Sequence, residues 1–114
     1  MKGKSDVFVK GTGTPWEDLG AGIRRKILGY DAGLMMTHIE FKMGAIGKVH
    51  KHEHRQVTFI QKGSFEVQIG GKKQILKSGD SFFVPSNVEH GVVALEESLL
   101  VDVFAPMRED FLER

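Results

Sequence analysis

Residues 65–76, FEVQIGGKKQIL, decide the class of fold. From Phe65 to Ile69 the side chains alternate between apolar and polar, which is the period of a half-buried β-strand. Gly70-Gly71 is a two-residue turn signal, and residues 72–76 would return antiparallel to the first strand. The stretch therefore predicts a β-hairpin.

Short runs of the same kind lie on both sides of this hairpin and are separated by turn residues. They cover residues 23–28, 34–43, 57–61, 81–84, 91–95 and 98–104. In the run 34–43, the side chains of Met35, Ile39 and Phe41 share one face. No helical pattern of about 10–12 residues interrupts the series, and 14 glycines against 3 prolines supply many turns. We expect an all-β domain, a closed antiparallel barrel or a sandwich of the jelly-roll kind.

The chain of 114 residues has the length of one domain. Residues 1–15 are polar apart from Val7-Phe8-Val9 and are interpreted as an arm or an edge strand. Residues 16–114 would form the barrel, with a short helical tail of one or two turns over 107–114. Because the apolar arm could add a strand to a neighbouring copy, we expect a homodimer.

Charge and composition exclude several classes of partner. The formal net charge is only +1, so neither nucleic acid nor an acidic membrane surface is an expected partner. The absence of cysteine excludes disulfides, thiolate metal sites and a cysteine nucleophile. Neither a signal-peptide pattern nor an apolar run of about 20 residues is present. We therefore predict a soluble, cytoplasmic protein.

The stretch 47–56, GKVHKHEHRQ, carries three histidines at intervals of two residues. On a strand, His50 and His52 would project from the same face, so their imidazoles could reach one metal ion. His54 continues the period, which makes a third inward ligand conceivable. The alternative is a polar strand on the surface, whose histidines bind no metal.

A second stretch, residues 79–90 (GDSFFVPSNVEH), favours the metal site. Together the two stretches match, in spacing, the double motif of the cupin superfamily, a family of metal-binding jelly-roll barrels. The matching positions are Gly44, His50, His52, Gln56, Gly63, Gly79, Pro85 and His90. This resemblance implies a metal ion held by His50, His52, Gln56 and His90, with His54 beside the site or at the surface.

Three positions depart from the cupin pattern. Asn87 replaces a glycine, and we expect the turn to survive because asparagine tolerates the left-handed backbone. Ala94 stands where asparagine is common. Gln56 replaces the usual glutamate, which leaves the site one negative charge short and the metal more electrophilic. That change disfavours oxygenase chemistry. Imidazole and amide ligands together suit Zn, Ni, Fe, Mn or Co.

One carboxylate interrupts the apolar run 98–104, SLLVDVF. Period two places Leu100, Asp102 and Phe104 on one face. A buried carboxylate is costly unless it is paired or used, so Asp102 is a candidate general acid or base. The alternatives are a solvated face or a backbone cap. Arg108 follows closely enough to fold over the barrel mouth and hold a substrate carboxylate, unless it is an ordinary surface arginine.

Residues 16–112 show a closer resemblance, carried by residues 17–20, 23–26, 50–56 and especially 102–112 (DVFAPMREDFL). They resemble the small cupins of pectin and alginate degradation, which linearise unsaturated monouronates. The resemblance implies a site of one divalent metal, Asp102, Phe104 and Arg108, a small acidic sugar as substrate, and an isomerase- or lyase-like ring opening. The motifs leave two alternatives open, a non-catalytic metal- and sugar-acid-binding module and an iron-dependent dioxygenase.

Overall fold

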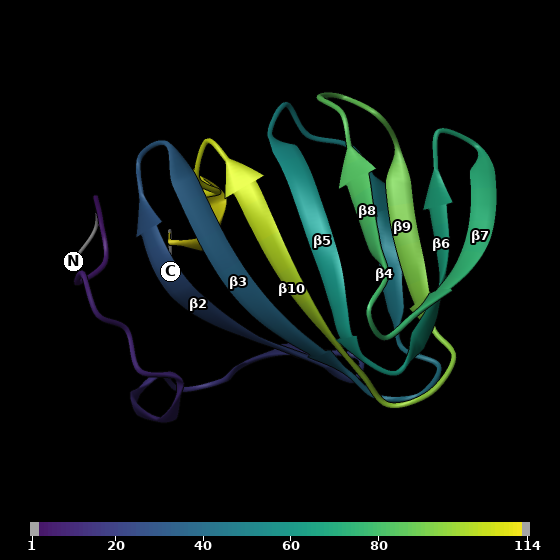
Figure 1. Ribbon diagram of the computed structural model, residues 1–114, viewed down its shortest axis with the longest axis horizontal. Coiled ribbons are helices and arrows are strands. Elements are labelled where there is room, and N and C mark those ends of the chain that lie inside the picture. Colours follow the sequence, from purple (N-terminus) through teal and green to yellow (C-terminus); the bar gives the residue numbers. More distant parts are fainter. Residues whose placement is uncertain (1–2, 113–114) are drawn as a thin grey trace.

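The computed structural model describes residues 3–112, so the first and last two residues of the expected arm and tail lie outside it. Ten strands make up most of this range (Figure 1). They are β1 (Glu17–Gly20), β2 (Ile23–Asp31), β3 (Leu34–Phe41), β4 (Ile46–His50), β5 (Arg55–Lys62), β6 (Ser64–Ile69), β7 (Lys72–Lys77), β8 (Ser81–Val84), β9 (His90–Ala94) and β10 (Ser98–Ala105).

The strands form two antiparallel sheets that face each other, as expected for a jelly-roll barrel. One sheet has the order β1-β2-β3-β10-β5-β8 and the other β4-β9-β6-β7. The predicted hairpin is β6 and β7, paired from Phe65 against Leu76 to Ile69 against Lys72. Gly70 and Gly71 both have positive φ, as a tight two-residue turn requires. The all-β prediction is confirmed.

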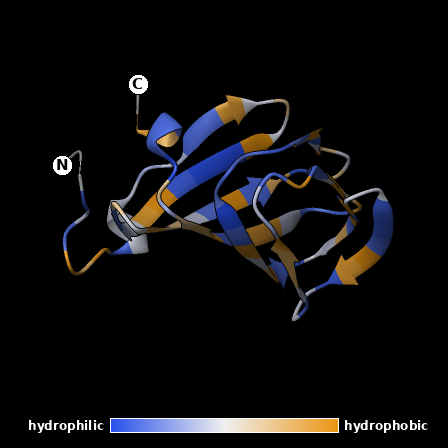
Figure 2. Ribbon diagram, turned by 90° about the horizontal axis from the view of Figure 1, so that it is seen from above, coloured by the Kyte–Doolittle hydropathy of each residue, from blue (hydrophilic) through white to orange (hydrophobic). Residues whose placement is uncertain are grey.

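The apolar core lies between the sheets. It is built from Phe41, Ile60, Phe65, Val67 and Leu100, each at most 4% exposed. The rings of Phe41 and Phe65 meet edge to face at 5.1 Å. In the view of Figure 2, apolar and polar residues alternate along the strands, as period two requires. This core closes one end of the interior and leaves the other end to polar side chains.

The two ends of the described chain lie outside the sheets. Residues 3–15 form no strand and contain a 3-10 turn at Gly11–Gly13, while Val7 and Phe8 are 93% and 88% exposed. The C-terminal tail contains a 3-10 turn, Glu109–Phe111, that lies beside β10 (Figure 1). None of the helices formed by residues 3–112 has the length and apolar character needed to cross a membrane.

Candidate metal centre

Three histidines converge at the open end of the interior. His50 is the last residue of β4 and pairs across the sheet with His90, the first residue of β9. His52 lies in the loop before β5, so its predicted place on a strand is wrong. Nevertheless, one ligand nitrogen from each ring lies within 4.8 Å of the others. The loop places His52 beside the other two rings, where it would also lie if the strand continued from His50 with alternate side chains pointing inward.

Backbone carbonyls set the tautomer of all three rings. Each Nδ1 lies 2.8–2.9 Å from the carbonyl oxygen of a residue two positions away. Those oxygens belong to Lys48 for His50, His54 for His52 and Val88 for His90. A carbonyl only accepts, so each Nδ1 donates and each neutral ring keeps its lone pair on Nε2. In His90, Nε2 is buried and has no partner within the described chain.

Burial keeps the imidazoles of His90 and His52 neutral near pH 7. It lowers the pKa of His90 to about 4, and the neighbouring histidines and Arg108 act in the same direction. It also lowers the pKa of His52, followed by the positive charge of Arg108. A metal ligand must be a neutral imidazole, so the site is prepared for a cation before one arrives.

Gln56 adds an oxygen to this group. It lies on β5, is 7% exposed, and its Oε1 is 3.1 Å from His52 Nε2. With the proton of His52 on Nδ1, both of these atoms are acceptors, and no proton lies between them. A cluster of imidazole lone pairs and one amide oxygen fits a divalent transition metal. The His50, His52 and His90 group is thus positioned to bind a metal ion.

Asp102 lies on the inward face of β10, beside the histidines. Ser98, Leu100, Asp102 and Phe104 are all buried in alternation, which confirms the predicted register of that strand. Thr58 Oγ1 donates to Asp102 Oδ1 at 2.5 Å and Gln56 Nε2 donates to the same oxygen at 3.2 Å. No hydrogen bond from residues 3–112 reaches Oδ2, the second carboxylate oxygen.

Burial raises the pKa of Asp102 to about 6. The hydrogen bonds from Thr58 and Gln56 and the charge of Arg108 oppose this rise but do not cancel it. A carboxylate with a pKa near 6 gains and loses protons easily at neutral pH. Asp102 therefore combines one fixed oxygen with one oxygen that is free to exchange a proton.

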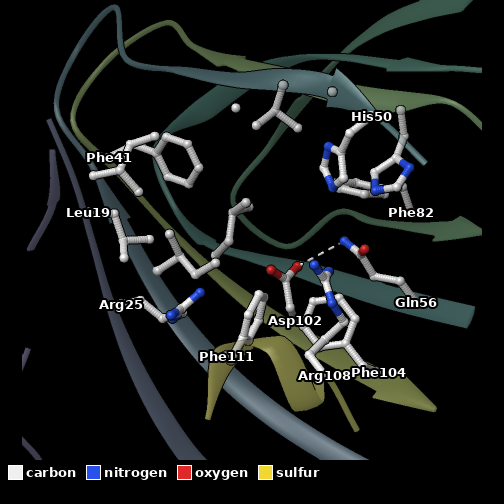
Figure 3. A pocket seen from close by; sticks show the side chains of 17 residues that line it. Leu19, Arg25, Phe41, His50, Gln56, Phe82, Asp102, Phe104, Arg108 and Phe111 are labelled. Carbon is white, nitrogen blue, oxygen red and sulfur yellow. Dashed lines mark hydrogen bonds between the residues drawn. The ribbon is translucent and has the colours of Figure 1, made fainter. Parts of the chain in front are cut away.

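Arg108 reaches the interior between the two sheets from the C-terminal tail (Figure 3). Its Nε and Nη2 donate to the two carboxylate oxygens of Asp110 at 3.0 and 2.9 Å. Its guanidinium carbon lies 4.3 Å from the ring centre of Phe111 and 5.2 Å from that of Phe104. The hydrogen bond from Arg108 lowers the pKa of Asp110. The arginine is thus held by an ion pair on one edge and by aromatic rings.

The cavity between the sheets has a volume of about 210 Å³. Its polar side carries His50, His90, Gln56, Asp102 and Arg108 (Figure 3). The remaining wall is mostly apolar and includes Leu19, Ile23, Ile39, Phe41, Phe82 and Val92. A ligand in this space would meet the histidines, Asp102 and Arg108 on one side and a mostly apolar wall that also carries Arg25 on the other.

The structure places most of the predicted site residues together. His50, Gln56, His90, Asp102, Phe104 and Arg108 line this cavity, and His52 lies against the ring of His90 at 4.8 Å. His54 is not a member of the converging group, but its backbone carbonyl orients His52. Asn87 has a φ of 60°, so its left-handed turn is as expected.

Sequence reasoning missed four residues around the site. Thr58 follows Gln56 by two positions on β5, and that period could have revealed it. Asp110 and Phe111 hold Arg108 from the tail, where no periodic pattern identifies them. Arg25 is 5% exposed, lies 3.8 Å over the ring of Phe111 and pairs with Glu17 at 3.3 Å. Arg25 follows Ile23 by two positions on β2 and so shares its face, and that period was the available signal.

Comparison with known proteins agrees with this geometry. The cupin domain family model matches residues 37–104. A pectin degradation protein, KdgF of Dickeya dadantii, is 54% identical over 101 residues, which cover 87% of this chain and 92% of that protein.

Two solved structures superpose over nearly the whole chain. An RmlC-like cupin from Shewanella frigidimarina has a TM-score of 0.94 at 44% identity, covering 97% of this chain and 99% of its own. KdgF from Halomonas sp. has a TM-score of 0.90 at 39% identity, covering 94% and 99%. The resemblance read from the two histidine stretches is confirmed. This chain belongs to the cupin family and, within it, to the group of the KdgF pectin degradation proteins.

Proposed function

We propose that this protein is a metal-dependent enzyme that opens the ring of 4,5-unsaturated uronate monosaccharides from pectin or alginate breakdown and yields the linear keto form. One observation carries the proposal. Asp102 Oδ2 is free of hydrogen bonds from the described chain and faces a cavity that also holds the histidine group and Arg108. The 54% identity to a pectin degradation protein supports the class of substrate.

In this proposal, the metal is held by His50, His52, His90 and, as fourth donor, Gln56 Oε1. The position of Oε1 beside His52 Nε2 supports the fourth ligand. A divalent metal there would supply Lewis-acid stabilisation of negative charge that develops on a substrate oxygen. Neutral ligands leave the full charge of the ion available for that purpose.

Asp102 moves the proton. Its Oδ2 accepts the proton of the anomeric hydroxyl on C1, and the bond between C1 and the ring oxygen breaks. C1 becomes an aldehyde, and the ring oxygen stays on C5 as an enolate. Asp102 then returns the proton to C4, the double bond moves from C4–C5 to C5–O, and C5 becomes a ketone. Substrate and product have the same formula, so the reaction is an isomerisation.

Arg108 and Phe104 position the sugar. The guanidinium edge that Asp110 does not occupy faces the cavity and would pair with the uronate carboxylate. Phe104 is 2% exposed and its ring lies 5.9 Å from that of His52, so it closes the wall beside the histidines. The apolar wall opposite would accept the face of the ring that lacks a hydroxyl at C4.

The variant Asp102→Asn tests the proposal. The absorbance of the C4–C5 double bond falls as substrate is converted, and we expect the variant to lose at least 100-fold in rate, the usual contribution of a general base. Its metal content should equal that of the wild type. Wild-type turnover with metal bound would reject the role of Asp102. Binding of the uronate without any product in the wild type would favour a binding module.

We also propose that the protein forms a homodimer in the cytoplasm. Apolar side chains are exposed on the outer face of the six-stranded sheet, where Met36, Val57, Phe59 and Phe83 are 41–53% exposed. Val7 and Phe8 on the arm are apolar and exposed as well. Equilibrium sedimentation at micromolar concentration should give twice the chain mass, and a monomer would reject the dimer. Cell fractionation tests the location.

A further inference from the structure

The side-chain amide of Gln56 contacts the histidine group at one end and Asp102 at the other. Its oxygen faces His52 Nε2 at 3.1 Å. Its nitrogen lies 2.9 Å from Thr58 Oγ1 and 3.2 Å from Asp102 Oδ1. All of these groups except His52 are at most 7% exposed. The amide is thus the direct link between the metal ligands and the carboxylate.

The hydrogen-bond network fixes which way this amide points. The single proton of Thr58 goes to Asp102 Oδ1, so Thr58 can only accept from Gln56. An ionised Asp102 also only accepts. Both atoms that face this end of Gln56 are therefore acceptors, which requires the NH₂ group there and leaves the oxygen for the histidines.

We propose that Gln56 is a positioning residue for Asp102, and that this second contact is why an amide stands where the cupin motif usually has an acid. The N–H of Gln56 and the O–H of Thr58 together hold Oδ1 and turn Oδ2 toward the cavity. The catalytic part of this inference rests on the proposed function, because it takes Asp102 as the proton-transferring group.

A glutamate at position 56 could bind a metal but could not hold Asp102 as the N–H of Gln56 does. One of its oxygens would lie where Nε2 now lies, about 3.2 Å from Asp102 Oδ1, and no donor lies between the two unless one acid takes up a proton. Two buried carboxylates at that separation repel each other strongly. The hydroxyl of Thr58 has one proton and could donate a hydrogen bond to only one of the two acids. Asp102 would lose its fixed orientation.

A double-mutant cycle on the metal-free protein tests the contact. The four proteins are the wild type, Gln56→Glu, Asp102→Asn and the double variant, unfolded with urea in the presence of a chelator. Gln56→Glu should raise the unfolding equilibrium constant at least about tenfold when Asp102 is present. In the Asp102→Asn background the loss should disappear, because the introduced asparagine can donate to the introduced glutamate.

Equal changes in both backgrounds would overturn the inference. So would Gln56→Glu proteins that fail to fold in both backgrounds, because the inference requires Asp102→Asn to rescue the glutamate. If Gln56→Glu unfolds only where Asp102 is present, the inference stands. The cycle contains no metal and no substrate, so its result does not depend on the proposed reaction.

Thr58 supplies the matched kinetic control. Thr58→Val removes the hydroxyl that holds Asp102 Oδ1 and leaves all four proposed ligands in place. We expect kcat to fall about tenfold or more with unchanged KM and metal content, and Thr58→Ser to restore it. An unchanged kcat in Thr58→Val would overturn the positioning role. If Asp102→Asn itself keeps full turnover, the proposed function fails, while the cycle still decides the contact.

Discussion

The buried carboxylate of Asp102 should lower the stability of the metal-free protein relative to the Asp102→Asn variant as the pH rises from 4 to 6. Asp102 is 5% exposed, and burial raises its pKa from 3.8 to about 6. The folded protein therefore binds more protons than the unfolded chain in this range. Stability falls wherever the folded state holds the extra proton and the pH rises. The full cost, reached above pH 6, is about 3 kcal/mol for a pKa difference of this size.

Asp102→Asn removes this ionisation and keeps an oxygen that can accept from Thr58 and Gln56. We expect the variant and the wild type to have similar stability at pH 4, with the variant more stable by about 2–3 kcal/mol at pH 7. For a domain of this length, that difference raises Tm by roughly 10 °C. Both proteins contain the same histidines, so their titration largely cancels from the comparison. The same substitution should abolish turnover.

The assay is urea unfolding with a chelator at several pH values between 4 and 7.5. Asp6→Asn is the matched control for the substitution itself, because Asp6 is exposed and does not line the cavity between the sheets. A difference between Asp102→Asn and the wild type that stays flat across this range would refute the reasoning. A variant that becomes relatively less stable as the pH rises would show that Arg108 stabilises the anion more than burial disfavours it.

Three further predictions concern the metal, a turn and the arginine. His90→Ala should lose most bound metal by elemental analysis, whereas His38→Ala, on the outer face of β3, should retain it. Gly63→Ala should lower the free energy of unfolding by about 2 kcal/mol or more, because φ is +83° and the new Cβ would collide with the side chain of Ser98; unchanged stability in urea would contradict this packing. Asp110→Asn should lower kcat/KM roughly three- to tenfold at unchanged metal content, since the exposed ion pair that holds Arg108 contributes about 1 kcal/mol; equal kinetics would show that Phe111 alone holds the arginine.

Alternation along the strands made most of the fold predictable. The runs 65–69, 81–84 and 98–104 lie almost residue for residue on β6, β8 and β10, because one face of each is buried and the period of two is strict. β1 was not predicted. Its sequence, Glu-Asp-Leu-Gly, has little intrinsic tendency to form a strand, and it is held by pairing with β2.

Site residues could be predicted where their chemistry differs from that of their neighbours in the sequence. Asp102 is a charge in an apolar strand, and the spacing of His50, His52 and His90 matches a known motif. The path of the loop that carries His52 could not be read from the sequence, because a backbone contact, from His52 Nδ1 to the carbonyl of His54, sets it. The supports of Arg108 were hidden for a similar reason, since tertiary packing of Phe111 between Arg25 and Arg108 folds the tail back.

Titration of turnover with metal tests the central claim most directly. Protein stripped by a chelator receives increasing amounts of one divalent transition metal at a time, and conversion of unsaturated galacturonate is followed by the loss of its double-bond absorbance. With the active metal, the rate should rise linearly and stop at one equivalent per chain, because His50, His52, His90 and Gln56 form one site. Full turnover in the stripped protein, or no turnover with any of Zn, Ni, Fe, Mn and Co, would contradict the account.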